Sequence, residues 1–243
     1  QRNRFDKRQD VAAGLRGRRV RQREAVEPHH KGTDGGQHEA IRAALKGYDR
    51  DRIFITSKIP PSELRHDDVL AMGNRALKEL GVEYLDLLLI HWPNEEIPIA
   101  ETLGAMALLV KQGKVRSIGV SNFMIPHLEE ALAVTEVPIT VDQVKFHPYH
   151  NQRALLEYCK AHDIVVTSYS SFGNGSLIGD QALKRIADKV GKSMPQVVLR
   201  WLLMKGVVVI PKSANPAHIK ANMDVFDWEL DAEDFAAIDA LSE

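Results

Sequence analysis

The sequence predicts an α/β protein built around a parallel sheet, and two observations support that prediction. Short apolar runs alternate with longer amphipathic segments from residue 52 onward. The apolar runs show no polar alternation, which is typical of parallel strands that are buried on both faces. Repeated β-then-α units of this kind form right-handed crossovers, either in an open doubly wound sheet or in a closed barrel.

Six strands and six helices are expected along the chain. The strands are predicted at 53–58, 85–91, 116–122, 140–146, 164–169 and 207–210. The helices are predicted at 67–80, 101–112, 125–134, 152–162, 180–190 and 196–205. Several helices end at a glycine, which readily adopts the left-handed conformation of a C-terminal cap; these glycines are Gly81, Gly113, Gly191 and Gly206.

Composition narrows the class of protein. The chain has 243 residues, of which 44% are hydrophobic, enough for the core of one large α/β domain. A net charge of −1 gives no basis for a nucleic-acid partner. Cys159 is the only cysteine, so no disulfide framework exists and a reducing cytoplasm is expected. The longest apolar runs are far shorter than the roughly 20 residues that span a bilayer, so no membrane partner is expected either.

Polar side chains are expected at the carboxyl end of every predicted strand, where α/β enzymes place their chemistry. One buried lysine or histidine would more often be a structural partner, but six successive polar ends predict a convergent binding site. Gly173, Gly175 and Gly179 do not have the GxGxxG spacing, and neither a P-loop nor a zinc-ligand spacing is present. The residues at these ends are Lys58, His91, Ser121, Asn122, Gln143, His147, Tyr169, Lys212 and Ser213.

Five stretches together resemble the aldo-keto reductase family, in the order and at the approximate separations of that family. They are IFITSK at 53–58, LDLLLIHWP at 85–93, GVSNF at 119–123, QVKFHPY at 143–149 and IPKS at 210–213. The resemblance covers about residues 40–243. It implies a (β/α)8 TIM barrel that binds NADPH without a Rossmann fold and reduces aldehydes and ketones. We expect a monomer that acts on a small-molecule carbonyl substrate.

The resemblance also implies which residues hold the cofactor. Ser121, Asn122 and Gln143 would bind the nicotinamide carboxamide, and the ring of Tyr169 would stack on the nicotinamide. His218 stands near the position where the family usually has an arginine, and a mostly neutral histidine is a weaker phosphate partner. NADP is therefore expected, with NAD as the alternative. Lys212 and Ser213 would bind the 2′-phosphate, and Asn222 matches an adenine contact. Ser170 and Phe172 complete the set of cofactor-binding candidates without an assigned contact.

Catalysis in the family uses an aspartate, a tyrosine, a lysine and a histidine. Lys58 and His91 match the lysine and the histidine, and Trp92 is expected in the substrate pocket. The aspartate and the tyrosine should precede Lys58 by about 25–30 residues, but residues 27–36 contain no tyrosine. Tyr48 is the first tyrosine of the chain and is expected in a turn after the first helix, not as a substitute. The expected function is therefore a carbonyl reductase, either intact or impaired by the missing pair, with a catalytically silent NADP-binding protein as the alternative. Another TIM-barrel enzyme, such as an aldolase with Lys58 as a Schiff-base lysine, is disfavoured by the consecutive nicotinamide-type ends.

Residues 1–40 are expected to form an atypical arginine-rich segment before a single barrel domain at 41–243. The first 36 residues contain eight arginines and no apolar run typical of a buried strand, so the first one or two barrel strands are poorly encoded. Three interpretations stay open: a basic arm, a disordered segment, and an altered reading frame. The last rests on residues 20–24, whose codons read one base later could spell Tyr-Gly-Asn-Glu, the end of the missing motif. Relatives usually continue past the last helix into a loop over the substrate, so the substrate stays unidentified.

Overall fold

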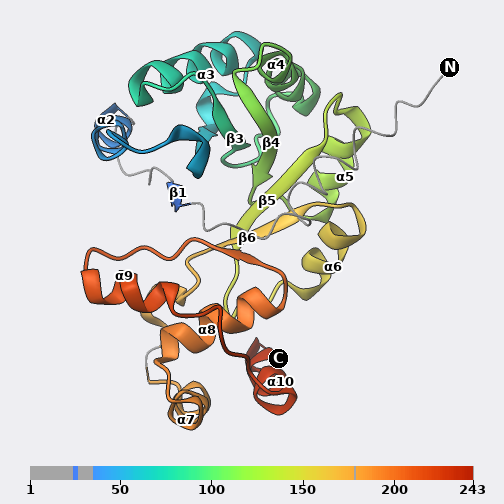
Figure 1. Cartoon of the computed structure of the whole chain (residues 1–243). Helices are drawn as coiled ribbons and strands as arrows, with labels where there is room; N and C mark the ends of the chain where they lie inside the picture. Colours follow the sequence, from blue (N-terminus) through green and yellow to red (C-terminus); the bar gives the residue numbers. More distant parts are fainter. Residues whose placement is uncertain (1–23, 27–34, 178, 243) are drawn as a thin grey trace, which may run out of the picture. The chain divides into compact units, whose positions relative to one another are not determined.

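The computed structural model describes residues 24–26, 35–177 and 179–242. The chain divides into two compact units, residues 1–141 and 142–243, and the boundary falls inside strand β5 (Ile139–Lys145) (Figure 1). The predicted domain boundary near residue 40 stays a prediction. No helix in the part of the chain that the structure describes is long and apolar enough to cross a bilayer.

The first unit contains a parallel sheet whose strands follow one another in sequence order. The strands before β5 are β1 (Glu24–Val26), β2 (Ile53–Ile59), β3 (Leu85–Ile90) and β4 (Val115–Ser121). In the ladder Lys58 lies opposite Leu89, and Leu89 lies opposite Gly119. The carboxyl ends of β2, β3 and β4 are therefore aligned residue by residue.

Helices of the first unit pack beside these strands, with α3 and α4 next to each other (Figure 1). The helix α3 buries Val69, Met72 and Leu80 and ends at Gly81, whose φ is +67°, so the predicted glycine cap is confirmed. The helical segments of this unit are α2 (Gly35–Ala44), η1 (Arg50–Arg52), η2 (Pro61–Glu63), α3 (His66–Leu80), α4 (Ile99–Lys111) and α5 (Ile125–Val134).

Gly119 in β4 lies where the sheet leaves no space for a side chain. A methyl group added to it would lie 2.5 Å from the carbonyl oxygen of Val141 and 2.8 Å from Cδ2 of Leu89. We expect Gly119→Ala to lower the free energy of unfolding by about 1–3 kcal/mol, the usual cost of overpacking, in urea titrations. The matched control is Gly104→Ala in α4, where the added methyl meets nothing within 4 Å. That variant should be neutral or more stable by up to about 1 kcal/mol, and equal losses in the two variants would contradict the prediction.

The second unit contains the end of β5, followed by β6 (Val165–Tyr169) and β7 (Val208–Val209). Strands β6 and β7 are parallel, with Thr167 opposite Val208. The prediction of a buried strand at 207–210 is wrong in extent, because β7 has two residues and Val208 is 45% exposed. Within the described residues β7 pairs only with β6, and an edge strand of this kind exposes side chains that a central strand would bury.

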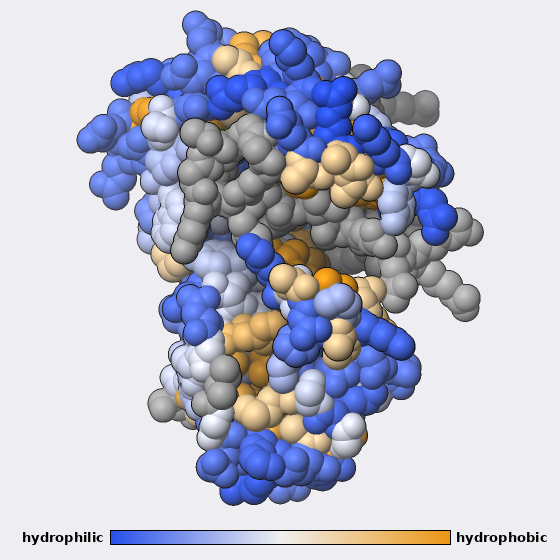
Figure 2. Space-filling view, turned by 90° about the vertical axis from the view of Figure 1, so that its left-hand side faces the viewer, coloured by the Kyte–Doolittle hydropathy of each residue, from blue (hydrophilic) through white to orange (hydrophobic). Residues whose placement is uncertain are grey.

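Helices surround the short strands of the second unit. The C-terminal helix is tied to α8 through Asp239, whose Oδ1 accepts hydrogen bonds from Trp201 Nε1 at 2.8 Å and Lys205 Nζ at 2.7 Å. In Figure 2 hydrophilic residues cover most of the visible coloured surface, and apolar residues gather in separate patches. The helical segments are α6 (Arg153–Ala161), η3 (Gly173–Gly175), α7 (Gln181–Val190), α8 (Met194–Met204), α9 (Pro216–Met223), α10 (Ala232–Asp239) and η4 (Ala240–Ser242).

The N-terminal part of the chain contains one short strand. Strand β1 pairs with β2 in parallel, with Glu24 opposite Ile53. Its three residues agree with the expectation that the first strands are poorly encoded, because pairing with the edge of β2 places residues that local propensity alone would not place. The other interpretations of residues 1–23 and 27–34, as a basic arm, a disordered segment or a frame-altered one, lie outside the described residues and stay predictions.

Candidate active site

The carboxyl ends of β2, β3 and β4 bring four predicted site residues to one edge of the first unit. Lys58 lies near the end of β2 and is 6% exposed, His91 follows β3, and Ser121 is the last residue of β4. Side chains alternate along a strand, and the observed register places Leu89 opposite both Lys58 and Gly119. Two residues further on, His91 and Ser121 therefore share the face of the sheet to which Lys58 belongs.

Asn122 connects the ends of these strands. Its backbone is left-handed, with a φ of +63°, a conformation that asparagine tolerates better than most residues. The side-chain amide donates to the carbonyl oxygen of His91 at 3.0 Å and to Ser121 Oγ at 3.1 Å. The His91 amide in turn donates to the carbonyl oxygen of Ile59 at 3.0 Å. These bonds hold the three strand ends in a fixed arrangement before any ligand binds.

Trp92 lies beside this group of residues. Its side chain is 47% exposed, and its ring centroid is 6.4 Å from that of the His91 imidazole. A large apolar ring that stays accessible next to a titratable ring suits the wall of a pocket for a small organic molecule. The position of Trp92 is therefore compatible with the substrate role that the sequence suggests.

The second unit carries predicted site residues on two neighbouring strands. Gln143 is buried in β5, and the half-buried Tyr169 ends β6. Burial raises the pKa of the Tyr169 phenol, which therefore stays neutral near pH 7 and offers an uncharged aromatic face. The turn that follows contains Ser170, with a φ of +51°, and Phe172, which precedes η3. Within β6 the hydroxyl of Ser168 donates to the carbonyl oxygen of Phe146, just after β5, at 2.7 Å.

The segment after β7 has the features of an anion site. Lys212 is exposed, and Ser213 Oγ accepts the Asn215 amide at 3.1 Å. Asn215 caps the N-terminus of α9, and a helix N-terminus favours negative charge. His218 and Asn222 are four residues apart on α9 and so lie on one face of that helix. An ammonium group beside a helix N-terminus fits a phosphate, so these residues are chemically suited to the phosphate end of NADP.

His147 is an unusual buried residue in the second unit. It follows β5 and is 4% exposed, and neither ring nitrogen has a hydrogen-bond partner among the residues that the structure describes. Burial, together with the smaller effect of the nearby charges of Lys145 and His150, lowers the pKa of His147 from 6.5 to about 4. The imidazole is therefore neutral at pH 7.

The low pKa of His147 predicts a pH-dependent stability. The folded-state pKa lies below the unfolded value, so the unfolded chain binds more protons and stability is lost as pH falls from 6.5 towards 4. We expect His147→Gln to flatten the dependence of the free energy of unfolding on pH in that window, measured by tryptophan fluorescence in urea. His66→Gln is the control, because the side chain of His66 is 47% exposed. A pH dependence that is unchanged in His147→Gln would contradict the prediction.

Sequence reasoning missed a charged network that supports the site from the other end of the strands. Asp86 is 2% exposed and accepts hydrogen bonds from Arg50 Nη2 at 2.7 Å and from the Ile55 amide at 2.9 Å. Arg116 lies 3.4 Å from the same carboxylate, and the Tyr84 ring lies 3.9 Å from the Arg50 guanidinium and 3.6 Å from that of Arg116. The available signal was one carboxylate inside the apolar run at 85–90. The network joins β2, β3 and β4 in the register that aligns their carboxyl ends.

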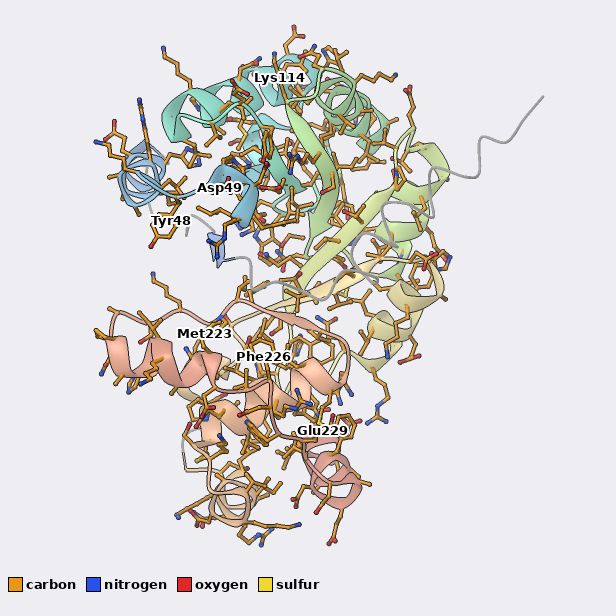
Figure 3. All side chains as sticks on the ribbon, in the orientation of Figure 1. Tyr48, Asp49, Lys114, Met223, Phe226 and Glu229 are labelled. Carbon is orange, nitrogen blue, oxygen red and sulfur yellow. The ribbon has the colours of Figure 1, made fainter. Side chains whose placement is uncertain are left out.

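Two other groups have a limited chemical role. Cys159 is fully buried, and burial raises the pKa of its thiol to about 12, so the group stays protonated and unreactive near neutral pH. Within 24–26, 35–177 and 179–242, no three histidine, cysteine or acidic side chains are grouped so that they could hold a metal ion. Tyr48 is 60% exposed and extends away from the ribbon (Figure 3), in the predicted turn after the first helix; the absence of a catalytic role stays a prediction.

The fold and the polar strand ends define a parallel α/β enzyme that lacks the glycine fingerprint of a Rossmann domain. The family model "Aldo/keto reductase family" matches residues 33–243, and the chain belongs to this family. A relative, the glyoxal reductase of Bacillus subtilis (strain 168), is 43% identical over 206 residues, which cover 84% of this chain and 74% of that protein.

Solved structures support the same assignment. The thermostable aldo-keto reductase Tm1743, solved with the inhibitor epalrestat, is 36% identical with a TM-score of 0.86, over 97% of this chain and 86% of that one. An aldo-keto reductase solved in complex with NADPH is 29% identical with a TM-score of 0.79, over 84% of this chain and 70% of that one. These similarities confirm the predicted (β/α)8 fold class and identify an oxidoreductase.

Proposed function

We propose that this chain reduces aldehyde or ketone groups to alcohols, with NADPH as the hydride source. The observation that carries the proposal is the arrangement of Lys58, His91, Ser121 and Asn122 at one edge and largely on one face of the sheet. Membership of the aldo/keto reductase family supports the reaction class, and the structure of a relative with NADPH supports the cofactor. One relative is named a glyoxal reductase, so a small dicarbonyl compound is a suitable first substrate.

The residues of this chain divide the binding of NADP between them. Ser121, Asn122 and Gln143 supply hydroxyl and amide groups that can hold a carboxamide, and Tyr169 supplies a neutral ring for stacking. Lys212, Ser213 and the N-terminus of α9 suit a phosphate, and His218 adds a second but weaker basic group. Bound NADPH supplies the hydride. The other residues assigned to this set are Ser170, Phe172 and Asn222.

Reduction of a carbonyl group places negative charge on its oxygen, which needs stabilisation and a proton. His91 can orient the carbonyl oxygen through a ring N–H, and the buried cation of Lys58 stabilises negative charge nearby. The family's tyrosine donor would fall within residues 27–36, which contain no tyrosine. Loss of a general acid typically costs about 10²–10⁴ in rate, so slow turnover is expected. The same absence favours the alternative, an NADP-binding protein without turnover.

A titration of the purified full-length chain with NADPH, followed by fluorescence, tests the proposal. NADH is titrated in parallel, and then glyoxal or an aromatic aldehyde is added to the NADPH complex. Binding followed by oxidation of NADPH supports the reductase. Binding without oxidation supports the silent binding protein, and no binding of either nucleotide contradicts both.

His218 is expected to limit the preference for NADPH over NADH. We expect His218→Arg to raise the ratio of the NADH and NADPH dissociation constants by about tenfold, because a guanidinium binds a phosphate through two hydrogen bonds. Lys212→Ala should lower the ratio by a similar factor. Lys220→Ala is the control, since Lys220 lies in the last turn of α9, away from its N-terminus. An unchanged ratio in both His218→Arg and Lys212→Ala would exclude this segment from phosphate recognition.

A monomeric, cytoplasmic enzyme without a nucleic-acid partner belongs to the same proposal. The balanced net charge of −1 and the single, buried cysteine support it. Light scattering coupled to gel filtration tests the monomer, and a mass of twice 27.2 kDa would contradict it.

A further inference from the structure

A cavity of about 150 Å³ lies within the first unit, between the segment that follows Trp92 and helix α5. Its floor includes the buried side chains of Leu64, Ile90 and Phe123. Lys58, His91 and Trp92 are not among its lining residues, although the lining residues Ile90 and Pro93 flank His91 and Trp92 in the sequence. Seven of its twelve lining residues are apolar, and its volume is about that of a cavity that holds benzene.

The polar groups of the wall are largely engaged in holding the cavity open. Asn94 Nδ2 donates to the carbonyl oxygen of Pro61 at 3.0 Å. Thr102 Oγ1 donates to the carbonyl oxygen of Leu64 at 2.6 Å. His127 Nδ1 accepts the Met124 amide at 3.1 Å and so fixes its ring beside Phe123. The first two bonds join the 61–64 segment to Asn94 and to α4, and the third orders the first turn of α5. These parts of the cavity wall are therefore held in place by the protein itself, as in most small-molecule sites.

Two carboxylates at the cavity remain without a cation. Glu95 belongs to the segment after Trp92 and Glu130 belongs to α5, and both side chains are exposed. Neither forms an ion pair with another residue in the described part of the chain, although both line the cavity. With His127 as the one basic side chain among the lining residues, the balance of charge is negative. An anionic ligand would be repelled, and a cationic one would be attracted.

We propose that this cavity binds a compact apolar amine, a primary ammonium group carried on one ring or a short hydrocarbon chain. The apolar part would contact Leu64, Ile90 and Phe123, and the ammonium group would lie at the mouth beside Glu95 and Glu130. The site does not depend on NADPH or on turnover, so it stands independently of the proposed reductase activity.

Benzylamine is the probe, and isothermal titration calorimetry of the full-length chain at low ionic strength is the measurement. The test variant is Glu95→Gln with Glu130→Gln, which removes both charges and keeps the side-chain shape. The matched control is Glu96→Gln with Glu129→Gln. Both of these glutamates are exposed, each is the sequence neighbour of one test residue, and neither lines the cavity. We expect the test variant to weaken binding about tenfold and the control to stay within about twofold.

Two further probes and one variant locate the site. Benzoate should not bind, and any binding of neutral benzyl alcohol should be equal in the wild type and in the test variant. Ile97→Trp fills the cavity without a change in charge and should abolish the binding of benzylamine, with circular dichroism as the check of folding. The proposal is overturned if the wild type does not bind benzylamine. It is also overturned if the two double variants weaken binding equally, or if folded Ile97→Trp binds as the wild type does.

Discussion

Replacement of Asp86 by alanine is expected to lower the free energy of unfolding by about 3–5 kcal/mol, the usual effect of breaking a buried ion pair. The carboxylate is 2% exposed and receives the Arg50 guanidinium at 2.7 Å and the Ile55 amide at 2.9 Å. Alanine would leave a partly buried cation without its partner and a backbone donor of β2 unsatisfied. Since domains have about 5–15 kcal/mol of stability in total, this single change removes a large share.

The control for Asp86→Ala is a carboxylate with the same chemistry on the surface. Asp67 pairs with His66 but has a side chain that is 98% exposed, so Asp67→Ala should cost under about 1 kcal/mol. Asp86→Asn keeps the shape and one acceptor oxygen and should fall between the two. Urea unfolding of all three variants supplies the comparison. A loss below 1 kcal/mol for Asp86→Ala would show that Asp86 does not hold the strands together.

The strands that position the first half of the site follow from the sequence because they are continuous apolar runs. The strand predicted at 53–58 is observed as β2, and those at 85–91 and 116–122 are observed as β3 and β4, with no end shifted by more than one residue. Burial on both faces makes such runs conspicuous in the sequence. The polar residue that interrupts each run at its carboxyl end was therefore also predictable, and Lys58, His91 and Ser121 were found in this way.

The features that the sequence does not predict depend on contacts between distant residues. Strand β1 has only three residues, and its pairing with β2, not its composition, places it. The Asp86 network joins Arg50, Ile55 and Arg116, which are 30 or more positions away from Asp86, and no local pattern links them. The cavity beside α5 likewise requires three segments to meet. Local periodicity reports which face is buried, but the partner that covers that face is a property of the fold.

Lys58→Met is expected to lower kcat for aldehyde reduction by about 10²–10⁴ while the dissociation constant of NADPH stays within about twofold. Methionine keeps the length and the apolar stem of a side chain that is 6% exposed, so the change removes the charge with little loss of packing. The reason for the large effect is that the charge acts on a carbonyl oxygen that becomes negative only during reduction.

The measurement is NADPH oxidation under single-turnover conditions, with enzyme in excess of NADPH, so that slow reduction by the parent chain is still detected. Lys78→Met in α3 is the matched control, because Lys78 is exposed and lies far along the chain from the strand ends. Lys58→Arg keeps the positive charge but changes the shape of the side chain. A rate above that of Lys58→Met would show that the loss of charge, and not the loss of shape, slows the reaction. A purely structural Lys58 would behave differently: Lys58→Met would then weaken NADPH binding and lower the free energy of unfolding together, with no separate loss in the rate of the bound complex. The two outcomes differ in which quantity changes, so a single set of variants decides whether the buried cation at the end of β2 takes part in the reaction.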